Sequence, residues 1–100
     1  MKKYFLAALF TCFLFGLFAQ PKQWKMVWSD EFNYYGLPND RKWNYDTVGN
    51  SYGWGNNEAQ WYTFARPQNA FVSNGTLKIT AIHEKTNIKN YSSARLTTKH

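Results

Sequence analysis

The sequence predicts an all-β fold of the sandwich or jelly-roll type, and three observations support this prediction. Short runs rich in aromatic and β-branched residues alternate with turn residues every 8–12 residues or so, at roughly the spacing of such folds. After the N-terminal apolar run, no segment sustains apolar residues at helical spacing. Finally, Asn74-Gly75 separates two strand-like runs, which is the strongest short signal for an antiparallel hairpin.

The N-terminus has the three parts of a secretory signal peptide. A basic Met-Lys-Lys head is followed by an almost entirely apolar run at 4–18, and then by the small residue Ala19. The run is shorter than the roughly 20 apolar residues that a membrane-spanning helix needs. We therefore expect a signal peptide at 1–19, with a buried helix as the alternative, and an exported domain at 20–100. This predicts a secreted, periplasmic or cell-surface protein.

Composition argues against nucleic acid as a partner and is compatible with a sugar. The formal charge is +6, but the basic residues are scattered, with no cluster beyond the Arg41-Lys42 pair. The only cysteine, Cys12, falls in the expected signal, so no disulfide should hold the exported domain. Aromatic residues make up 20% of the chain, with five tryptophans. Such rings stack on the apolar faces of pyranoses.

The strands expected after the signal are short and are separated by loops rich in Asn, Gly, Ser and Tyr. The third of them should end at Arg66-Pro67, because proline cannot donate to a β-ladder. The run that follows Asn74-Gly75 should alternate, with Leu77, Ile79 and Ala81 on one face of a half-buried antiparallel sheet and Lys78, Thr80 and Ile82 on the other. In chain order the expected strands are 25–28, 43–48, 59–64, 70–73, 76–82 and 94–98, with loops at 33–40 and 49–57.

No catalytic pair can be assembled from the residues alone. Glycoside hydrolysis with retention needs two carboxyls about 5–5.5 Å apart. Asp30 and Glu31 are adjacent, so in a strand they would point to opposite faces. His83 and His100 are the only histidines and lie in no triad motif, and we interpret His83 as structural. Zinc-ligand spacing and a phosphate-binding glycine loop are also missing from the sequence.

The most distinctive loop is the run GWGNNEAQWYT at 53–63. It places Trp54 beside two amides, Asn56 and Asn57, and the carboxylate of Glu58. Amides and carboxylates form the paired hydrogen bonds that sugar hydroxyls favour. The two asparagines would equally serve to cap a turn. From the residues alone, sugar contact and turn chemistry remain equally supported.

Four stretches in order resemble the N-terminal portion of glycoside hydrolase family 16, in particular its laminarinase-like (endo-β-1,3-glucanase) branch. They span nearly the whole chain after the signal, and the ordered set is more specific than any one of them. The Asn-Asn-Glu loop and the Ser-Ala-Arg-Leu segment favour the laminarinase branch. The stretches are VWSDEFN at 27–33, GWGNNEAQWYT at 53–63, NAFVSNGTLKI at 69–79 and YSSARLTTK at 91–99.

The resemblance implies a concanavalin-like jelly roll of two curved antiparallel sheets, of which 20–100 would be the N-terminal part. It also implies a retaining mechanism, carried by a Glu-x-Asp-x-x-Glu strand whose first Glu is the nucleophile and whose last is the acid/base. That signature is absent from these 100 residues. We therefore expect no catalytic residue in this chain, a truncated domain that is inactive alone, and catalytic residues beyond His100.

The resemblance also assigns binding positions. Asn57 and Arg95 match residues that contact glucose on the non-reducing side of the cleft, and Trp54 matches a position near its rim. Many family members hold a structural calcium, whose ligands match Glu31 and the backbone carbonyl of Gly75, so a structural Ca²⁺ is the one cofactor implied. The implied partner is a laminarin-like β-glucan, bound by a protein that is monomeric at full length and free of the membrane after signal cleavage.

Three functions are compatible with these features. The first is a secreted endo-β-1,3-glucanase. The second is a non-catalytic β-glucan recognition protein that keeps the cleft and loses the catalytic carboxylates. The third, a cell-surface adhesion module, would explain the aromatic content but not the ordered set of motifs.

Overall fold

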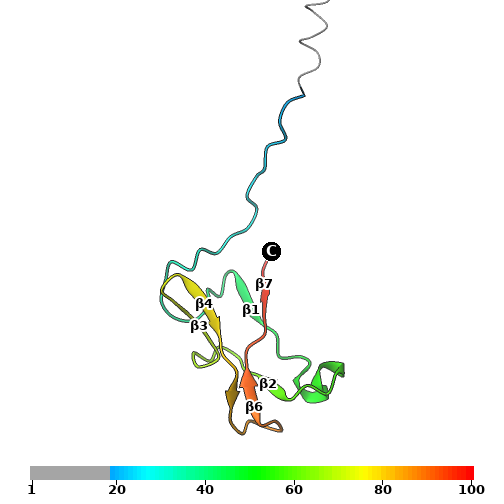
Figure 1. Cartoon of the computed structure of the whole chain (residues 1–100). Coiled ribbons are helices and arrows are strands. Elements are labelled where there is room, and N and C mark those ends of the chain that lie inside the picture. Colours follow the sequence, from blue (N-terminus) through cyan, green and yellow to red (C-terminus); the bar gives the residue numbers. More distant parts are fainter. Residues whose placement is uncertain (1–18) are drawn as a thin grey trace, which may run out of the picture.

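The computed structural model describes residues 19–100, and regular structure there is all strand apart from one short 3-10 helix (Figure 1). The predicted all-β class is therefore confirmed. The expected signal peptide lies outside the described residues, except for Ala19. Between residues 19 and 100, no helix is long and apolar enough to cross a membrane. The elements are β1 (Trp43–Tyr45), η1 (Asn50–Gly55), β2 (Gln60–Tyr62), β3 (Ala70–Ser73), β4 (Thr76–Ile79), β5 (Ile82–His83), β6 (Tyr91–Ser93) and β7 (Leu96–Thr98).

These strands form three small sheets. β1 pairs with β7 antiparallel, β3 with β4 antiparallel, and the third sheet has the order β2-β6-β5. Within that third sheet β2 and β6 run parallel, with Trp61 opposite Ser92. Our expectation of purely antiparallel pairing is thus wrong at this point. The physical reason is the long intervening segment, which carries β3, β4 and β5 and returns the chain in its original direction before β6 begins.

The predicted hairpin is confirmed in its turn and its register. Ser73 lies opposite Thr76, and the two turn residues between them have positive φ angles of 51° at Asn74 and 78° at Gly75. The second strand is shorter than the predicted run 76–82. Asn69 binds both backbone groups of Thr80, which donates to the Asn69 carbonyl at 2.9 Å and accepts from its Nδ2 at 3.1 Å. These bonds lie one residue beyond the last regular pair, Ala70 with Ile79, and the chain then pairs with β6 as β5.

Several other expectations need correction. The run 25–28 is not a strand: Val27 is 91% exposed, and a single extended segment without a partner is not a stable strand. The expected alternation after the turn holds only for Leu77, which is half-buried, whereas Ile79 and Ala81 are exposed because no described second layer covers that face. Strand β6 was not predicted, and η1 lies within the expected loop 49–57. The strands predicted at 43–48, 59–64 and 94–98 exist in shortened form as β1, β2 and β7.

The core is small and as polar as it is apolar. The buried apolar residues are Ala70, Val72 and Ala94, and the buried polar ones are Asn50, Asn69 and Ser92. Large apolar side chains such as Trp24, Met26 and Phe64 remain exposed. Buried amides and hydroxyls must therefore be satisfied by hydrogen bonds for this part of the fold to hold.

Asp30 ties the extended N-terminal segment to the sheets. Its carboxylate accepts hydrogen bonds from Trp43 Nε1 at 2.8 Å, from the Phe32 backbone N–H at 3.0 Å and from the Tyr34 hydroxyl at 2.9 Å. Burial opposes ionisation, but these three bonds and the charge of Lys42 outweigh it and lower the pKa of Asp30. The carboxylate thus stays ionised as a bridge between residues 30–34 and β1.

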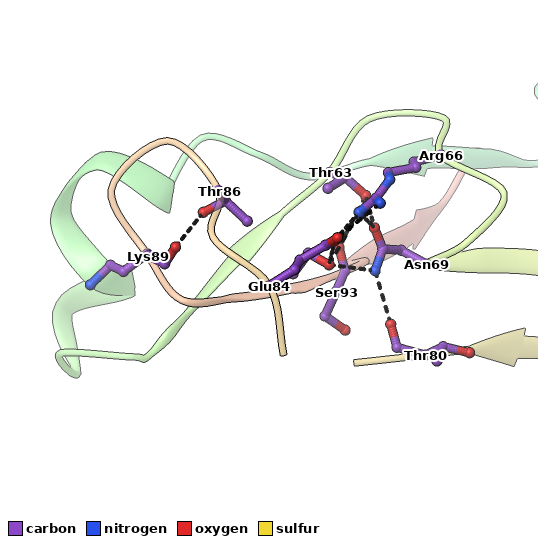
Figure 2. A network of polar contacts seen from close by, with 9 residues as sticks. Thr63, Arg66, Asn69, Thr80, Glu84, Thr86, Lys89 and Ser93 are labelled. Carbon is purple, nitrogen blue, oxygen red and sulfur yellow. Dashed lines mark hydrogen bonds and ion pairs between the residues drawn. The ribbon is translucent and has the colours of Figure 1, made fainter. Parts of the chain in front are cut away.

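A polar network joins the β2–β3 connection to β5 and β6 (Figure 2). The Arg66 guanidinium forms a two-point ion pair with Glu84, and Ser92 donates to the same carboxylate. Asn69, which is fully buried, donates to Ser92 Oγ at 3.0 Å. The hydrogen bonds from Arg66 and Ser92 hold the pKa of Glu84 at about 2, against a partial opposition from burial.

Candidate carbohydrate-binding site

The structure brings together two of the residues that the resemblance assigned to substrate binding. The guanidinium carbon of Arg95 lies 4.3 Å from the centroid of the Trp54 ring. Trp54 belongs to η1, whereas Arg95 lies between β6 and β7. A guanidinium over an indole face at this distance is a cation–π contact. The pair places an indole ring, one face of which the guanidinium covers, and charged hydrogen-bond donors at one place.

Trp54 has an unusual backbone conformation. Its φ and ψ are 57° and 22°, in the left-handed region that bulky residues rarely adopt. Gly53 before it also has a positive φ, of 58°. The Trp54 N–H donates to the Gly49 carbonyl at 3.0 Å, which holds the turn closed. Strained non-glycine residues of this kind concentrate at functional sites, so the geometry marks η1 as a candidate binding loop.

The indole of Trp54 is held in place by its neighbours. Tyr62 of β2 contacts it edge-on, with ring centroids 5.4 Å apart. Asn50, 2% exposed, accepts from Trp54 Nε1 at 3.4 Å and from the Tyr62 N–H at 2.9 Å, and donates to the Tyr62 carbonyl at 2.7 Å. Gly49 lies directly against the ring, since a Cβ added there would be 2.2 Å from Trp54 Cδ2. Trp54 is therefore a fixed part of the surface.

Arg95 is placed by the β1–β7 ladder. Tyr45 is paired with Leu96, and the next step outward puts Asp46 opposite Arg95, where the Asp46 N–H donates to the Arg95 carbonyl at 2.8 Å. The two side chains meet as well, because Arg95 Nε lies 3.2 Å from Asp46 Oδ2. The Arg95 side chain is 46% exposed. In residues 19–100, its terminal nitrogens Nη1 and Nη2 donate to no side chain or backbone group.

Asn57, the third predicted binding residue, lies in the turn after η1. It is exposed and has a φ of 57°, a conformation that asparagine tolerates better than most residues. The neighbouring amide of Asn56 donates to Glu58 Oε1 at 3.1 Å, and Gln60 Nε2 donates to Glu58 Oε2 at 2.9 Å. The geometry supports the turn role of Asn57 and leaves its side chain open to solvent.

An open concavity of about 460 Å³ adjoins this turn. One of its lining residues is Tyr62, the same residue that contacts the indole of Trp54. Its wall combines aromatic rings with the carboxylate of Glu58 and the amide of Gln60, a mixture suited to sugar rings and their hydroxyls. Both carboxylates near the site are engaged, Asp46 by Arg95 and Glu58 by amides. Among the described residues at this surface, neither of these two carboxylates is without a side-chain partner. The lining residues are Glu58, Ala59, Gln60, Tyr62, Ala81, Tyr91 and Ser93.

The two residues assigned to calcium offer only a partial ligand set. Glu31 is exposed, and Gly75 sits in the β3–β4 turn with a φ of 78°. Calcium takes six to eight oxygen ligands. Residues 19–100 contain no group of three or more Asp, Glu, His or Cys side chains able to hold a metal ion. One carboxylate and one carbonyl do not make a calcium site by themselves.

Sequence reasoning missed the residues that hold the site together. Asn50 had only a weak signal, an Asn after Gly in an expected loop. Asp46 had none, because its partner Arg95 is distant in sequence and an opposite charge far along the chain predicts no contact. Tyr62 was placed in a strand but not against Trp54. All three are supporting residues whose role depends on which segments meet in space.

Comparison with known proteins shows what the chain resembles. No family model matches it. A beta-glucanase from Rhodothermus marinus is 47% identical over 98 residues, covering 96% of this chain and 34% of that protein. The solved structure of SCLam, a non-specific endo-β-1,3(4)-glucanase from family GH16, is 44% identical with a TM-score of 0.70, covering 79% of this chain and 32% of that one. LamA from Z. galactanivorans, solved with laminaritriose and laminaritetraose, is 51% identical with a TM-score of 0.68. The match covers 74% of this chain and 32% of that one.

The all-β fold, together with this similarity to solved glucanase structures, places the described strands in the β-jelly-roll class of proteins. The chain belongs to glycoside hydrolase family 16, in its laminarinase-like branch. It spans about a third of the length of the Rhodothermus relative and of each of the two solved structures.

Proposed function

We propose that the full-length protein carrying this chain is a retaining endo-β-1,3-glucanase, and that the described residues form part of its glucan-binding cleft. The observation that carries the proposal is the Arg95 guanidinium lying over Trp54, with its terminal donors open, in a chain 47% identical to a beta-glucanase. In this proposal Trp54, Arg95 and Asn57 contact glucosyl units, and the catalytic carboxylates lie outside these 100 residues.

The chemistry of the three residues suits a neutral sugar. A pyranose ring places its axial C–H groups against an aromatic face, and its hydroxyls accept from a guanidinium or pair with an amide. Bonds to hydroxyls that strengthen in the transition state contribute to rate as well as affinity. The partner in this proposal is therefore a laminarin-like β-glucan, bound by a monomer.

Laminarin hydrolysis by the full-length protein tests this function. Endo-cleavage predicts a rapid fall in viscosity and a ladder of oligosaccharides, and retention predicts that the first product seen by NMR has the β configuration. Laminarin binding without release of reducing ends would instead establish the β-glucan recognition protein. Neither binding nor hydrolysis of any β-1,3-glucan would refute the proposal.

Export and calcium belong to the same proposal. The basic head and apolar run that end at Ala19 support secretion, and mass spectrometry of the exported protein should find an N-terminus at or near Gln20. An exported protein that retains Met1 would contradict it.

Calcium would use Glu31 and the Gly75 carbonyl as two of its ligands, the remainder coming from outside these 100 residues. Chelation with EDTA should then lower the melting temperature of the full-length protein, and added Ca²⁺ should restore it.

A further inference from the structure

The ion pair between Asp46 and Arg95 has a geometry that separates the donors of the guanidinium into two sets. Asp46 Oδ2 lies 3.2 Å from Nε, the nitrogen nearest the chain. Guanidinium carries five N–H donors in a rigid plane, so fixing Nε fixes the direction of the other four. Those four belong to Nη1 and Nη2, which have no acceptor among residues 19–100.

The Arg95 guanidinium also lies against the indole ring of Trp54. Arg95 Cζ is 4.3 Å from the Trp54 centroid, and Trp54 is in turn fixed by Gly49, Asn50 and Tyr62. A long arginine side chain that is 46% exposed would ordinarily sample several rotamers at an entropic cost to any ligand that orders it. Contacts at Nε and on the flat face remove that freedom before a ligand arrives.

The β1–β7 pairing places Asp46 where its carboxylate can restrict the Arg95 side chain. Its own N–H donates to the Arg95 carbonyl at 2.8 Å, so the two residues are opposed in backbone as well as in side chain. The Asp46 side chain is only 26% exposed, less than that of its partner. An exposed ion pair of this kind contributes little to stability. The effect of the ion pair is instead to fix the direction of the Arg95 guanidinium.

We infer that Asp46 is a positioning residue for substrate: it holds Arg95 flat on Trp54 so that Nη1 and Nη2 are presented to the hydroxyls of a glucosyl unit. This inference rests on the proposed glucan-binding function and extends it to a residue that does not touch the sugar. It predicts that loss of Asp46 affects binding through Arg95 alone.

The first test is kinetic and uses the full-length protein on laminarin. Asp46→Ala should raise KM roughly 3- to 10-fold while kcat stays within about 2-fold, the pattern of lost uniform binding. Asp46→Asn, which keeps an acceptor for Nε, should recover part of that loss. Asp40→Ala, which removes an exposed acid with no side-chain partner in residues 19–100, is the matched control and should leave KM unchanged. In an Arg95→Ala background, Asp46→Ala should have no further effect.

The second test does not depend on activity. The Nε–H proton of Arg95, identified by its loss in Arg95→Ala, should be shifted in ¹⁵N NMR spectra by the Trp54 ring current, and Asp46→Ala should move it toward the position of a free arginine. An unchanged KM in Asp46→Ala, additive effects of the two substitutions, or an unmoved Nε–H resonance would each overturn the inference. If the parent protein does not act on or bind β-1,3-glucan, the proposed function fails, and the NMR result alone decides whether Asp46 positions Arg95.

Discussion

Arg95 and Trp54 lie in contact, with the guanidinium carbon 4.3 Å from the ring centroid, although Arg95 follows β6 and Trp54 lies within the 3-10 helix η1. The contact joins the second and the fourth of the four stretches that resemble family motifs, the GWGNNEAQWYT run at 53–63 and the YSSARLTTK run at 91–99. Because the indole is fixed on its other sides, the pair is a preformed surface rather than a chance encounter of two exposed side chains.

Arg95→Ala should lower kcat/KM on laminarin by roughly 10- to 100-fold, since a lost hydrogen bond from a charged group costs about 1.5–3 kcal/mol. Its ion pair with Asp46 is half-exposed, so the melting temperature of the full-length protein should change little. Arg41→Ala, which removes an exposed arginine, is the control and should affect neither quantity. A lowered melting temperature with unchanged kinetics would remove Arg95 from the site.

Asn57 can be tested by two substitutions that separate turn chemistry from sugar contact. Alanine at a φ of 57° costs about 1–2 kcal/mol, whereas glycine adopts this conformation freely. If the amide contacts sugar, Asn57→Ala and Asn57→Gly should both lower kcat/KM about 3- to 10-fold. Only Asn57→Ala should lower the melting temperature. Full activity in Asn57→Gly would show that the residue serves the turn alone.

Gly49→Ala should displace the indole of Trp54, because the new methyl would lie 2.2 Å from Cδ2. Gly49 has a φ of −82°, so the effect is steric and involves no backbone strain. Overpacking of this kind costs about 1–3 kcal/mol, which urea denaturation would detect. In a Trp54→Ala background the same substitution should cost much less. An equal cost in both backgrounds would show that Gly49 and the indole are not in contact in solution.

Glu84 should make the stability of the protein depend on pH in the acid range. Its pKa is lowered from 4.5 to about 2 in the folded state, chiefly by Arg66 and Ser92. The resulting stabilisation is present in full above the unfolded value of 4.5 and is lost as the pH falls toward 2. Glu84→Gln should therefore lower the melting temperature at pH 7, and its difference from the parent should shrink between pH 4.5 and pH 2. A difference that does not vary with pH would contradict the ion-pair role.

The isolated segment 20–100 should hydrolyse nothing and should be insoluble or partly folded. It contains no Glu-x-Asp-x-x-Glu signature, and it exposes large apolar side chains such as Trp24, Met26 and Phe64 beside short unpaired strand edges. Reducing-sugar release from laminarin above a mock preparation would disprove the first expectation. A sharp two-state melt with monomeric elution would disprove the second.

The fold class and the local turns could be predicted because their signals are local. Asn74-Gly75 specifies its own turn by tolerating positive φ, and the alternation of glycine-rich loops with aromatic runs excludes a helical domain. The predicted strand at 25–28 failed for a non-local reason, since an extended run becomes a strand only where a partner lies beside it. The same holds for β6, whose parallel partner β2 lies far back in the sequence.

The all-β class, the hairpin turn and the residue types of the candidate binding loop could be read from the order of the amino acids. Three contacts became visible only in the folded chain: Asp46 opposes Arg95, Arg95 lies on Trp54, and Asn50 hydrogen-bonds to both Trp54 and Tyr62. A charged, aromatic or amide side chain does not indicate which distant residue it will contact, because that depends on how the chain folds. Strand pairing between β1 and β7 sets the register of the chain, and a shift of one residue would turn Arg95 to the opposite face.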